Sequence, residues 1–252
     1  MKIMQVRALL IAAVAVVFAV GSPATARELV DLLLVLASDV SRSVDSAKFQ
    51  LQRDGYAAAF SDPRVLEAIS SGKHGRIAVC FVEWSGSTAQ KVVIDWTVIK
   101  DAESGRQFGD KLVELPRSFA ERTSISAGID FSMLQFDRSP YEGGRRTIDV
   151  SGDGTNNSGR DVRSARDEAV AKDVTINGLV ILSERPLSWN PDHTHPPGGL
   201  QNYYRDNVIG GAGAFVLAAE NFQSFGKALI TKLIAEIAMT APVQQAALLP
   251  LP

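Results

Sequence analysis

The sequence predicts a three-layer α/β protein, in which helices cover both faces of an open, mostly parallel sheet with one antiparallel edge strand. Apolar strand-like segments alternate with helix-like segments along most of the 252 residues, which is typical of parallel sheets. Several strand-like segments are apolar throughout, as expected for strands buried on both faces. Two of them are joined by too few residues for a parallel crossover, which predicts the antiparallel edge.

The elements follow one another in a simple order. Strands are expected over residues 30–36, 76–84, 91–96, 146–151, 174–182 and 214–218. Helices are expected over residues 45–69, interrupted at Pro63, and over residues 102–115, 124–136, 161–172 and 222–239. The short connection 85–90 makes its two strands a hairpin. Together these elements form one domain over residues 27–241.

Both ends of the chain are expected to lie outside that domain. Lys2 and Arg7 precede an apolar run over residues 8–20, and Ala-Thr-Ala at residues 24–26 fits a cleavage site, so residues 1–26 are predicted to be a signal peptide. The run is too short to span a bilayer. We expect an exported protein, periplasmic or secreted, with no stable membrane insertion after cleavage. Residues 242–252 have no periodicity and predict a disordered tail.

Composition excludes several classes of function. A formal net charge of −2 argues against a nucleic-acid partner, which would need a basic face. The single Cys80 lies in an apolar run and predicts a buried, inert thiol rather than a zinc site or disulfide. Residues 183–200 are rich in Pro, His, Ser and Gly and predict a long surface loop. We interpret His193 and His195, within that loop, as solvated polar residues rather than a small metal site.

Oxygen-bearing side chains cluster after the first predicted strand. Asp39, Ser41 and Ser43 form an Asp-x-Ser-x-Ser motif in the turn that leads to the next helix. A carboxylate with hydroxyls is an oxygen-only set that suits Mg²⁺, Mn²⁺ or Ca²⁺ rather than copper or structural zinc. Taken alone, the motif is also compatible with simple helix capping.

Two further features lie elsewhere in the chain. Asp153 belongs to a Gly-Asp-Gly turn after the predicted strand 146–151, and Thr123 directly precedes a predicted helix. Separately these are a turn and a helix cap. Asp39 and Asp153, however, both fall at the carboxyl ends of parallel strands, where open α/β sheets bind ligands.

These residues resemble the metal-ion-dependent adhesion site of von Willebrand factor type A domains. The family's Asp-x-Ser-x-Ser matches Asp39, Ser41 and Ser43, its Thr matches Thr123, and the aspartate of its Thr-Asp-Gly matches Asp153. The likeness covers about residues 29–240, including the hairpin edge. Three stretches, 82–86, 149–157 and 208–215, also resemble an uncharacterised bacterial group of exported domains of unknown function.

The resemblance implies capture of a partner through a metal rather than enzyme catalysis. Ser41, Ser43 and Thr123 would bind a divalent cation directly, most readily Mg²⁺, with Mn²⁺ or Ca²⁺ as alternatives. Asp39 and Asp153 would bind it directly or through water. A Glu or Asp from a partner protein would fill the open coordination position.

The chain departs from the family pattern around residues 149–152. Ser151 and Gly152 precede Asp153 where the family has an apolar residue and Thr. Asp149 lies in mid-strand, where a buried carboxylate is costly unless paired. Asp149 and Ser151 are therefore possible supports behind the metal ligands. For Asp149 an ion pair with an arginine is an equally good interpretation.

An enzyme is the alternative hypothesis. Residues 152–157, Gly-Asp-Gly-Thr-Asn-Asn, resemble the metal motif of haloacid-dehalogenase-type phosphatases, in which Asp39 would be the nucleophile and Mg²⁺ would be the cofactor. Such enzymes need a second acid two residues after the nucleophile, and that position is Ser41. The last motif position is Asn157 instead of Asp. The adhesion site therefore remains the favoured interpretation.

Overall fold

A computed structural model describes residues 27–183 and 185–238. The predicted signal peptide and tail lie outside the described residues. The strands are β1 (Glu28–Val30), β2 (Leu33–Asp39), β3 (Ile77–Trp84), β4 (Gln90–Ile99), β5 (Tyr141–Gly143), β6 (Arg146–Gly152), β7 (Thr175–Ile181) and β8 (Val216–Ala219). The helices are α1 (Ser46–Ser61), α2 (Pro63–Ser70), α3 (Ala102–Glu114), α4 (Ile125–Arg138), α5 (Val162–Val170), α6 (Pro191–Thr194), α7 (Leu200–Asn207), the 3-10 turn η1 (Phe222–Ser224) and α8 (Phe225–Ala238).

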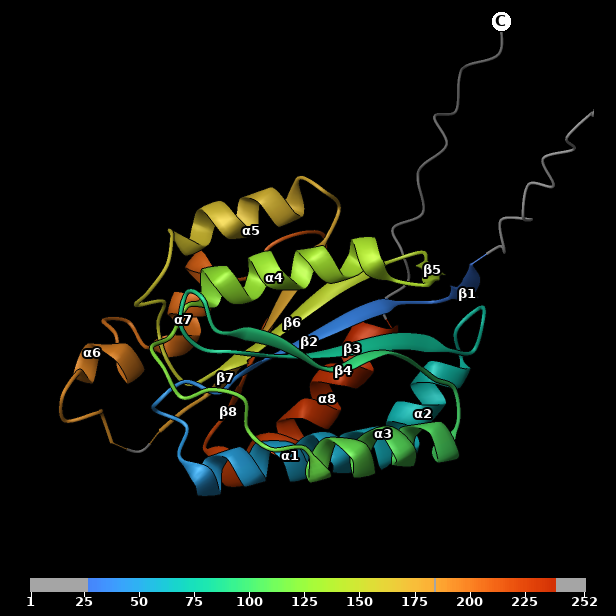
Figure 1. The fold of residues 1–252 in the computed structure, drawn as a ribbon, viewed down its shortest axis with the longest axis horizontal. Helices are drawn as coiled ribbons and strands as arrows, with labels where there is room; N and C mark the ends of the chain where they lie inside the picture. The colour runs from blue at the N-terminus through green and yellow to red at the C-terminus, as the bar shows by residue number, and fades with distance from the viewer. Residues whose placement is uncertain (1–26, 184, 239–252) are drawn as a thin grey trace, which may run out of the picture.

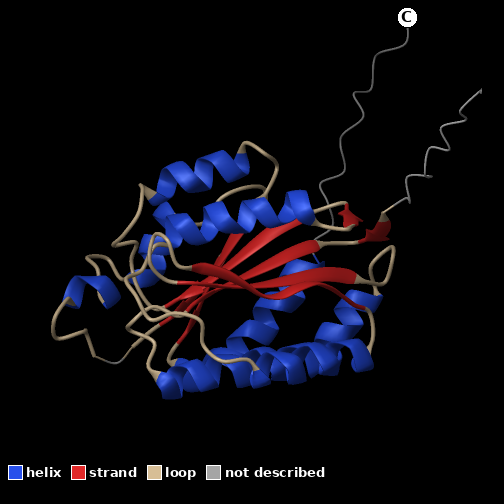
Figure 2. Cartoon of the chain, viewed as in Figure 1, coloured by secondary structure: helices blue, strands red, loops and turns tan. Residues whose placement is uncertain are grey.

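The predicted fold class is confirmed. Six strands form one sheet in the order β4-β3-β2-β6-β7-β8, with β4 antiparallel to β3 at one edge and the other neighbours parallel. Helices α1, α2, α3 and α8 cover one face, and α4, α5 and α7 cover the other (Figure 1). Figure 2 shows the sheet lying between the two helical layers.

The apolar strands supply both cores, as their unbroken hydrophobicity predicts. All seven residues of β2 are buried. Val35 and Ala37 pack in the core under α4 and α5, whereas Leu34 and Leu36 pack in the core under α1 and α8. Alternate side chains of one strand thus face opposite layers, which anchors β2 and fixes where its carboxyl end lies.

The first strand differs from its predicted boundaries. The expected strand over residues 30–36 is divided into β1, which pairs with β5, and β2, which runs on to Asp39. The division falls at Asp31, whose carboxylate accepts the backbone N–H groups of His74 and Arg76. Asp39 is therefore the last residue of β2 and not the first residue of the following loop.

The expected long loop over residues 183–200 is also partly wrong. It contains the short helix α6 and leads directly into α7. Leu200 and Tyr204, four residues apart, are buried and attach α7 to the sheet, a helical spacing that the polar composition of the segment concealed. Other details agree with expectation: Pro63 opens α2, and Cys80 is buried, which raises the pKa of its thiol to about 12.

No helix within residues 27–183 and 185–238 has the length and apolarity needed to cross a bilayer.

Candidate metal centre

The structure brings together all five side chains that the sequence predicts to bind a cation. Asp39 ends β2, Ser41 and Ser43 lie in the loop before α1, Thr123 precedes α4, and Asp153 follows β6. Each is at most 7% exposed. Because β2 and β6 are parallel neighbours, their carboxyl ends meet at the same edge of the sheet, as open α/β sheets require of a ligand site.

A continuous chain of hydrogen bonds links the hydroxyl groups. Thr123 Oγ1 donates to Ser41 Oγ (3.0 Å), and Ser41 Oγ lies 3.2 Å from Ser43 Oγ. Ser43 Oγ then donates to Asp153 Oδ1 (2.5 Å). Three hydroxyl oxygens and one carboxylate oxygen from three separate segments are therefore joined end to end.

Local capping leaves these hydroxyl groups available. The backbone N–H of Ser41 donates to Asp39 Oδ1 (2.7 Å), which turns the chain at the end of β2. Asp45, not one of the motif serines, caps α1 by accepting the N–H of Lys48. Ser124 caps α4 by accepting the N–H of Ala127. The capping interpretation of the motif serines and Thr123 is therefore wrong.

Neither carboxylate is paired with a fully buried cation, although the half-buried Arg117 interacts electrostatically with both. Asp39 Oδ2 and Asp153 Oδ2 are buried and have no hydrogen-bond partner among the described residues. Burial, followed by the charge of Asp153, raises the pKa of Asp39 to about 7. Lys48 Nζ stands 3.6 Å from Asp153 Oδ2 and is 27% exposed. A cation here would offset the cost of burying two acids.

The chemistry of the ligand set agrees with a hard divalent cation. The five groups offer only oxygen atoms, the ligands that Mg²⁺, Mn²⁺ and Ca²⁺ prefer. Throughout the described chain, no group of three or more His, Cys, Asp and Glu residues is placed to hold a metal ion. A site at Asp39 would therefore depend on serine and threonine hydroxyls in addition to its carboxylates.

Two asparagines support the site, a role that the sequence did not predict for them. Asn157 Oδ1 accepts the N–H of Thr123 (3.1 Å), and the N–H of Asn157 donates to the carbonyl of Thr123 (2.9 Å). Asn156 Oδ1 accepts the N–H of Ser126 (3.1 Å). The segment after Asp153 thus holds the start of α4 in position, and the adjacent asparagines in a turn were the available signal.

The prediction that His193 is a solvated loop residue is wrong. Its side chain is only 2% exposed, and Nε2 lies 3.2 Å from Thr123 Oγ1. Burial lowers the pKa of the His193 ring. His195 is exposed, in agreement with the prediction. No local pattern distinguishes the two histidines, because the burial of His193 depends on how α6 folds over the end of the sheet.

Asp149 and Ser151 point away from the hydroxyl chain. Asp149 Oδ1 lies 2.7 Å from Lys232 Nζ on α8, so this buried acid forms an ion pair, with a lysine in place of the expected arginine. Ser151 Oγ lies 2.9 Å from the hydroxyl of Tyr56 on α1. Both contacts are on the α1 and α8 side of the sheet, so neither residue is a direct support of the five-residue cluster.

A groove opens beside the cluster. Its cavity has a volume of about 320 Å³ and reaches Ser43, Thr123 and His193. Arg42 and Arg122 line it, and so does Trp189, whose side chain is 60% exposed. Glu121 also lines the groove, but the two arginines and the exposed indole still make its surface suited to an acidic protein segment.

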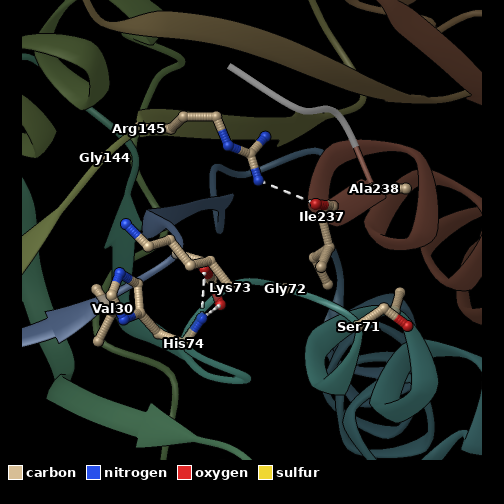
Figure 3. Close-up of a pocket in the computed structure, with 11 residues that line it drawn as sticks. Val30, Ser71, Gly72, Lys73, His74, Gly144, Arg145, Ile237 and Ala238 are labelled. Atoms are coloured by element: carbon tan, nitrogen blue, oxygen red, sulfur yellow. Dashed lines mark hydrogen bonds between the residues drawn. The ribbon is translucent and has the colours of Figure 1, made fainter.

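A second cavity lies at the amino end of the sheet, away from this site. It has a volume of about 500 Å³. Figure 3 shows Arg145 pointing toward Ile237, where it donates to the backbone carbonyls of Glu236 (2.8 Å) and Ile237 (2.9 Å) at the end of α8. Asp31 accepts the N–H of His74 in the same cavity. These charged groups are already engaged in holding the fold together.

The fold is that of a von Willebrand factor type A-like domain, as predicted. The chain is similar to the solved structure of proximal thread matrix protein 1 from the mussel byssus with a zinc-occupied MIDAS motif (15% identity, TM-score 0.57), covering 84% of this chain and 50% of that one. It is similar to the pilus adhesin SpaC from Lactobacillus rhamnosus GG (10% identity, TM-score 0.59), and the likeness covers 84% of this chain and 31% of the adhesin. It is also similar to a von Willebrand factor type A structure from Catenulispora acidiphila (12% identity, TM-score 0.53), and the likeness covers 83% of this chain and 42% of that one.

Residues 29–241 match the model of the family described as "Protein of unknown function (DUF1194)", and the chain belongs to that family. No curated protein matches the sequence. The chain spans about half the length of the mussel protein and less of the adhesin and of the Catenulispora structure. At these levels of identity the solved structures establish the fold.

Proposed function

We propose that this domain binds a divalent cation at the five-residue cluster and uses it to hold an acidic side chain of a partner protein. The observation that carries the proposal is the pair of buried, unpartnered oxygens, Asp39 Oδ2 and Asp153 Oδ2, beside three linked hydroxyls. Ser41, Ser43 and Thr123 would bind the cation directly, and the two aspartates would bind it directly or through water. When bound, the cation supplies the positive charge to which an incoming carboxylate can bind.

The groove beside the cluster supports a protein partner. Arg42 and Arg122 would attract an acidic segment, and Trp189 would cover its apolar part. A metal-bound adhesion motif is recorded for the mussel protein, and adhesion for the pilus protein. With the predicted signal peptide, these likenesses support a role outside the cytoplasm. The oxygen ligands favour Mg²⁺, with Mn²⁺ or Ca²⁺ as alternatives.

The phosphatase alternative has weaker support. A nucleophilic Asp39 would have to reach a phosphate, yet its side chain is fully buried and its Oδ1 accepts the N–H of Ser41. Ser41 stands where the second acid of such an enzyme would be. Hydrolysis of an aryl phosphate that disappears in Asp39→Asn would favour this alternative over adhesion.

Thermal unfolding with added metal tests the cation site. A cation at about 100 times its Kd stabilises the folded state by about 2.7 kcal/mol, so Mg²⁺ or Mn²⁺ should raise Tm in the wild type. Asp39→Ala and Asp153→Ala should lose this rise, whereas the matched variant Asp161→Ala, at an exposed helix cap, should keep it. A rise that persists in both site variants would refute the assignment.

Capture of the partner requires a separate experiment. Crosslinking in the native cell envelope should yield a complex that chelator abolishes and excess Mg²⁺ restores. Trp189→Ala should reduce the yield without altering the metal-induced rise in Tm, because Trp189 lines the groove but contributes none of the five ligands. A complex that forms equally with chelator would contradict metal-bridged binding.

A further inference from the structure

His193 is built into the metal centre from a different segment than the predicted ligands. Its position depends on two features of the turn after β6. The backbone N–H of Thr155 donates to the His193 carbonyl (2.9 Å), which ties α6 to this turn. A Cβ on Gly154 would stand 2.2 Å from His193 Nε2, so only glycine at 154 leaves room for the ring. The chain therefore makes a specific space for an imidazole beside Thr123.

The spacing of His193 from the hydroxyl cluster matches that of neighbouring ligands of one ion. Two ligands at right angles, each about 2.1 Å from a cation, are separated by about 3 Å. The separations from Thr123 Oγ1 to Ser41 Oγ and from Ser41 Oγ to Ser43 Oγ are 3.0 and 3.2 Å. His193 Nε2 lies 3.2 Å from Thr123 Oγ1 and continues the same series.

The far side of the ring is held in either tautomer. His193 Nδ1 lies 3.2 Å from Thr155 Oγ1 and 3.3 Å from Asn157 Nδ2. When Nδ1 carries the proton it donates to Thr155, and the Nε2 lone pair faces the cluster. When Nδ1 is unprotonated it accepts from Asn157, and Nε2–H donates to Thr123. Histidines that bind metals are oriented through their second nitrogen in this way.

We propose that His193 Nε2 is a further ligand of the cation, contributed by α6, and that it directs the site toward metals that accept imidazole. This inference rests on the proposed function and deepens it. Four side chains, Ser41, Ser43, Thr123 and His193, would then bind directly. A nitrogen ligand favours Zn²⁺, Co²⁺ or Ni²⁺ over Mg²⁺ and Ca²⁺. A six-coordinate ion would still have positions for water and for a partner's carboxylate.

The test compares Zn²⁺ with Mg²⁺ in matched histidine variants. His193→Gln should weaken Zn²⁺ binding by at least about 10- to 100-fold, the range found when support of a metal ligand is lost. It should change the Kd for Mg²⁺ far less, because Mg²⁺ gains little from nitrogen. His195→Gln, two residues away and exposed, should bind both ions like the wild type.

X-ray absorption at the zinc edge provides a direct readout, and its first measurement, on the wild type, needs no variant to fold. With one equivalent of Zn²⁺, the wild type should show imidazole scattering, which should remain in His195→Gln and disappear in His193→Gln. His193→Asn serves as a second variant, because its shorter side chain fits the same space without reaching the ion. Absence of imidazole scattering in the wild type, or its loss in His195→Gln instead, would overturn the inference.

The two proposals fail in different ways. If Zn²⁺ and Mg²⁺ bind, Asp39→Ala abolishes both, and His193→Gln changes neither, the cation site stands and the role of His193 is refuted. If neither ion binds to the wild type, or if Asp39→Ala binds both as well as the wild type does, the cation site itself is refuted and the role of His193 is refuted with it.

Discussion

Two pairs of buried acids lie in this domain, and they are neutralised differently. Asp149 on β6 and Glu236 on α8 both contact Lys232, whose ammonium group is completely buried. Asp39 and Asp153, at the end of the sheet, are equally buried, and the cations near them are the partly exposed Lys48 and Arg117, whose guanidinium group donates to the carbonyls of Val40 and Ser41. The first pair shares a fully buried cation and the second does not, although each pair also has buried carboxylate oxygens without a hydrogen-bond partner among the described residues.

The difference separates a structural cluster from a binding site. Glu236 Oε1 also accepts a hydrogen bond from Asn177 (2.8 Å), so the pair around Lys232 has a counter-charge and a neutral donor within the fold. An acid pair without an internal counter-charge raises the free energy of the folded state unless a cation from solution joins it. A cation bound from solution would therefore stabilise the folded state at the Asp39–Asp153 pair more than at the pair that already contacts Lys232.

Removing the internal cation should produce the largest effect. Lys232→Met leaves two buried carboxylates unpaired, and loss of one partner of a buried ion pair costs about 3–5 kcal/mol. We expect a fall of that size in the free energy of unfolding, measured by urea denaturation in the presence of chelator. If the loss is below about 1 kcal/mol, the two acid pairs do not differ in the way proposed.

The fold was predictable because continuous apolar runs form buried strands and apolar residues at helical spacing form helices that pack on them. The mixed sheet, the hairpin and Pro63 follow from local patterns. The boundary of β2 did not, because Asp31 ends β1 through hydrogen bonds to the backbone of residues 74 and 76, far away in the sequence. Helix α7 was missed because its buried residues, Leu200 and Tyr204, are diluted by polar neighbours.

The candidate site was predictable where a motif encodes it. Asp39 and Asp153 fall at strand ends that the alternation of elements locates. His193 was not predictable, since its burial is created by α6 closing over a glycine in another loop. The partner of Asp149 was equally hidden, because Lys232 lies on the closing helix and no short-range pattern connects it to β6.

The second prediction concerns pH. Burial and the charge of Asp149 raise the pKa of Glu236 from 4.5 to about 7, against the opposing effects of Lys232 and Asn177; Arg145 also lies close. The folded state thus holds this proton more tightly than the unfolded state. Its contribution to stability is complete below pH 4.5 and is lost as the pH rises toward 7.

Glu236→Gln should remove the part of that dependence that Glu236 contributes, whereas Asp39, whose pKa is also raised to about 7, keeps its own part. The free energy of unfolding of the wild type should fall between about pH 5 and 7, by about 1.4 kcal/mol for each pH unit by which the pKa of Glu236 in the folded state exceeds its value in the unfolded state. The variant should show a flatter profile in the same chelator-containing buffer. Glu168→Gln, on the exposed face of α5, is the control. Parallel profiles for wild type and Glu236→Gln would contradict a raised pKa.

The smallest effect is expected at Lys48, which faces the open acid pair as Lys232 faces the closed one. Lys48 Nζ is 3.6 Å from Asp153 Oδ2 and also donates to the Ser43 carbonyl (2.8 Å). Since Lys48 is partly exposed, Lys48→Met should cost about 1 kcal/mol or less without metal. Removing its positive charge should also tighten Mg²⁺ binding, by at most about fivefold for 1 kcal/mol. A weaker affinity would show that Lys48 supports the metal centre rather than competing with the cation for Asp153.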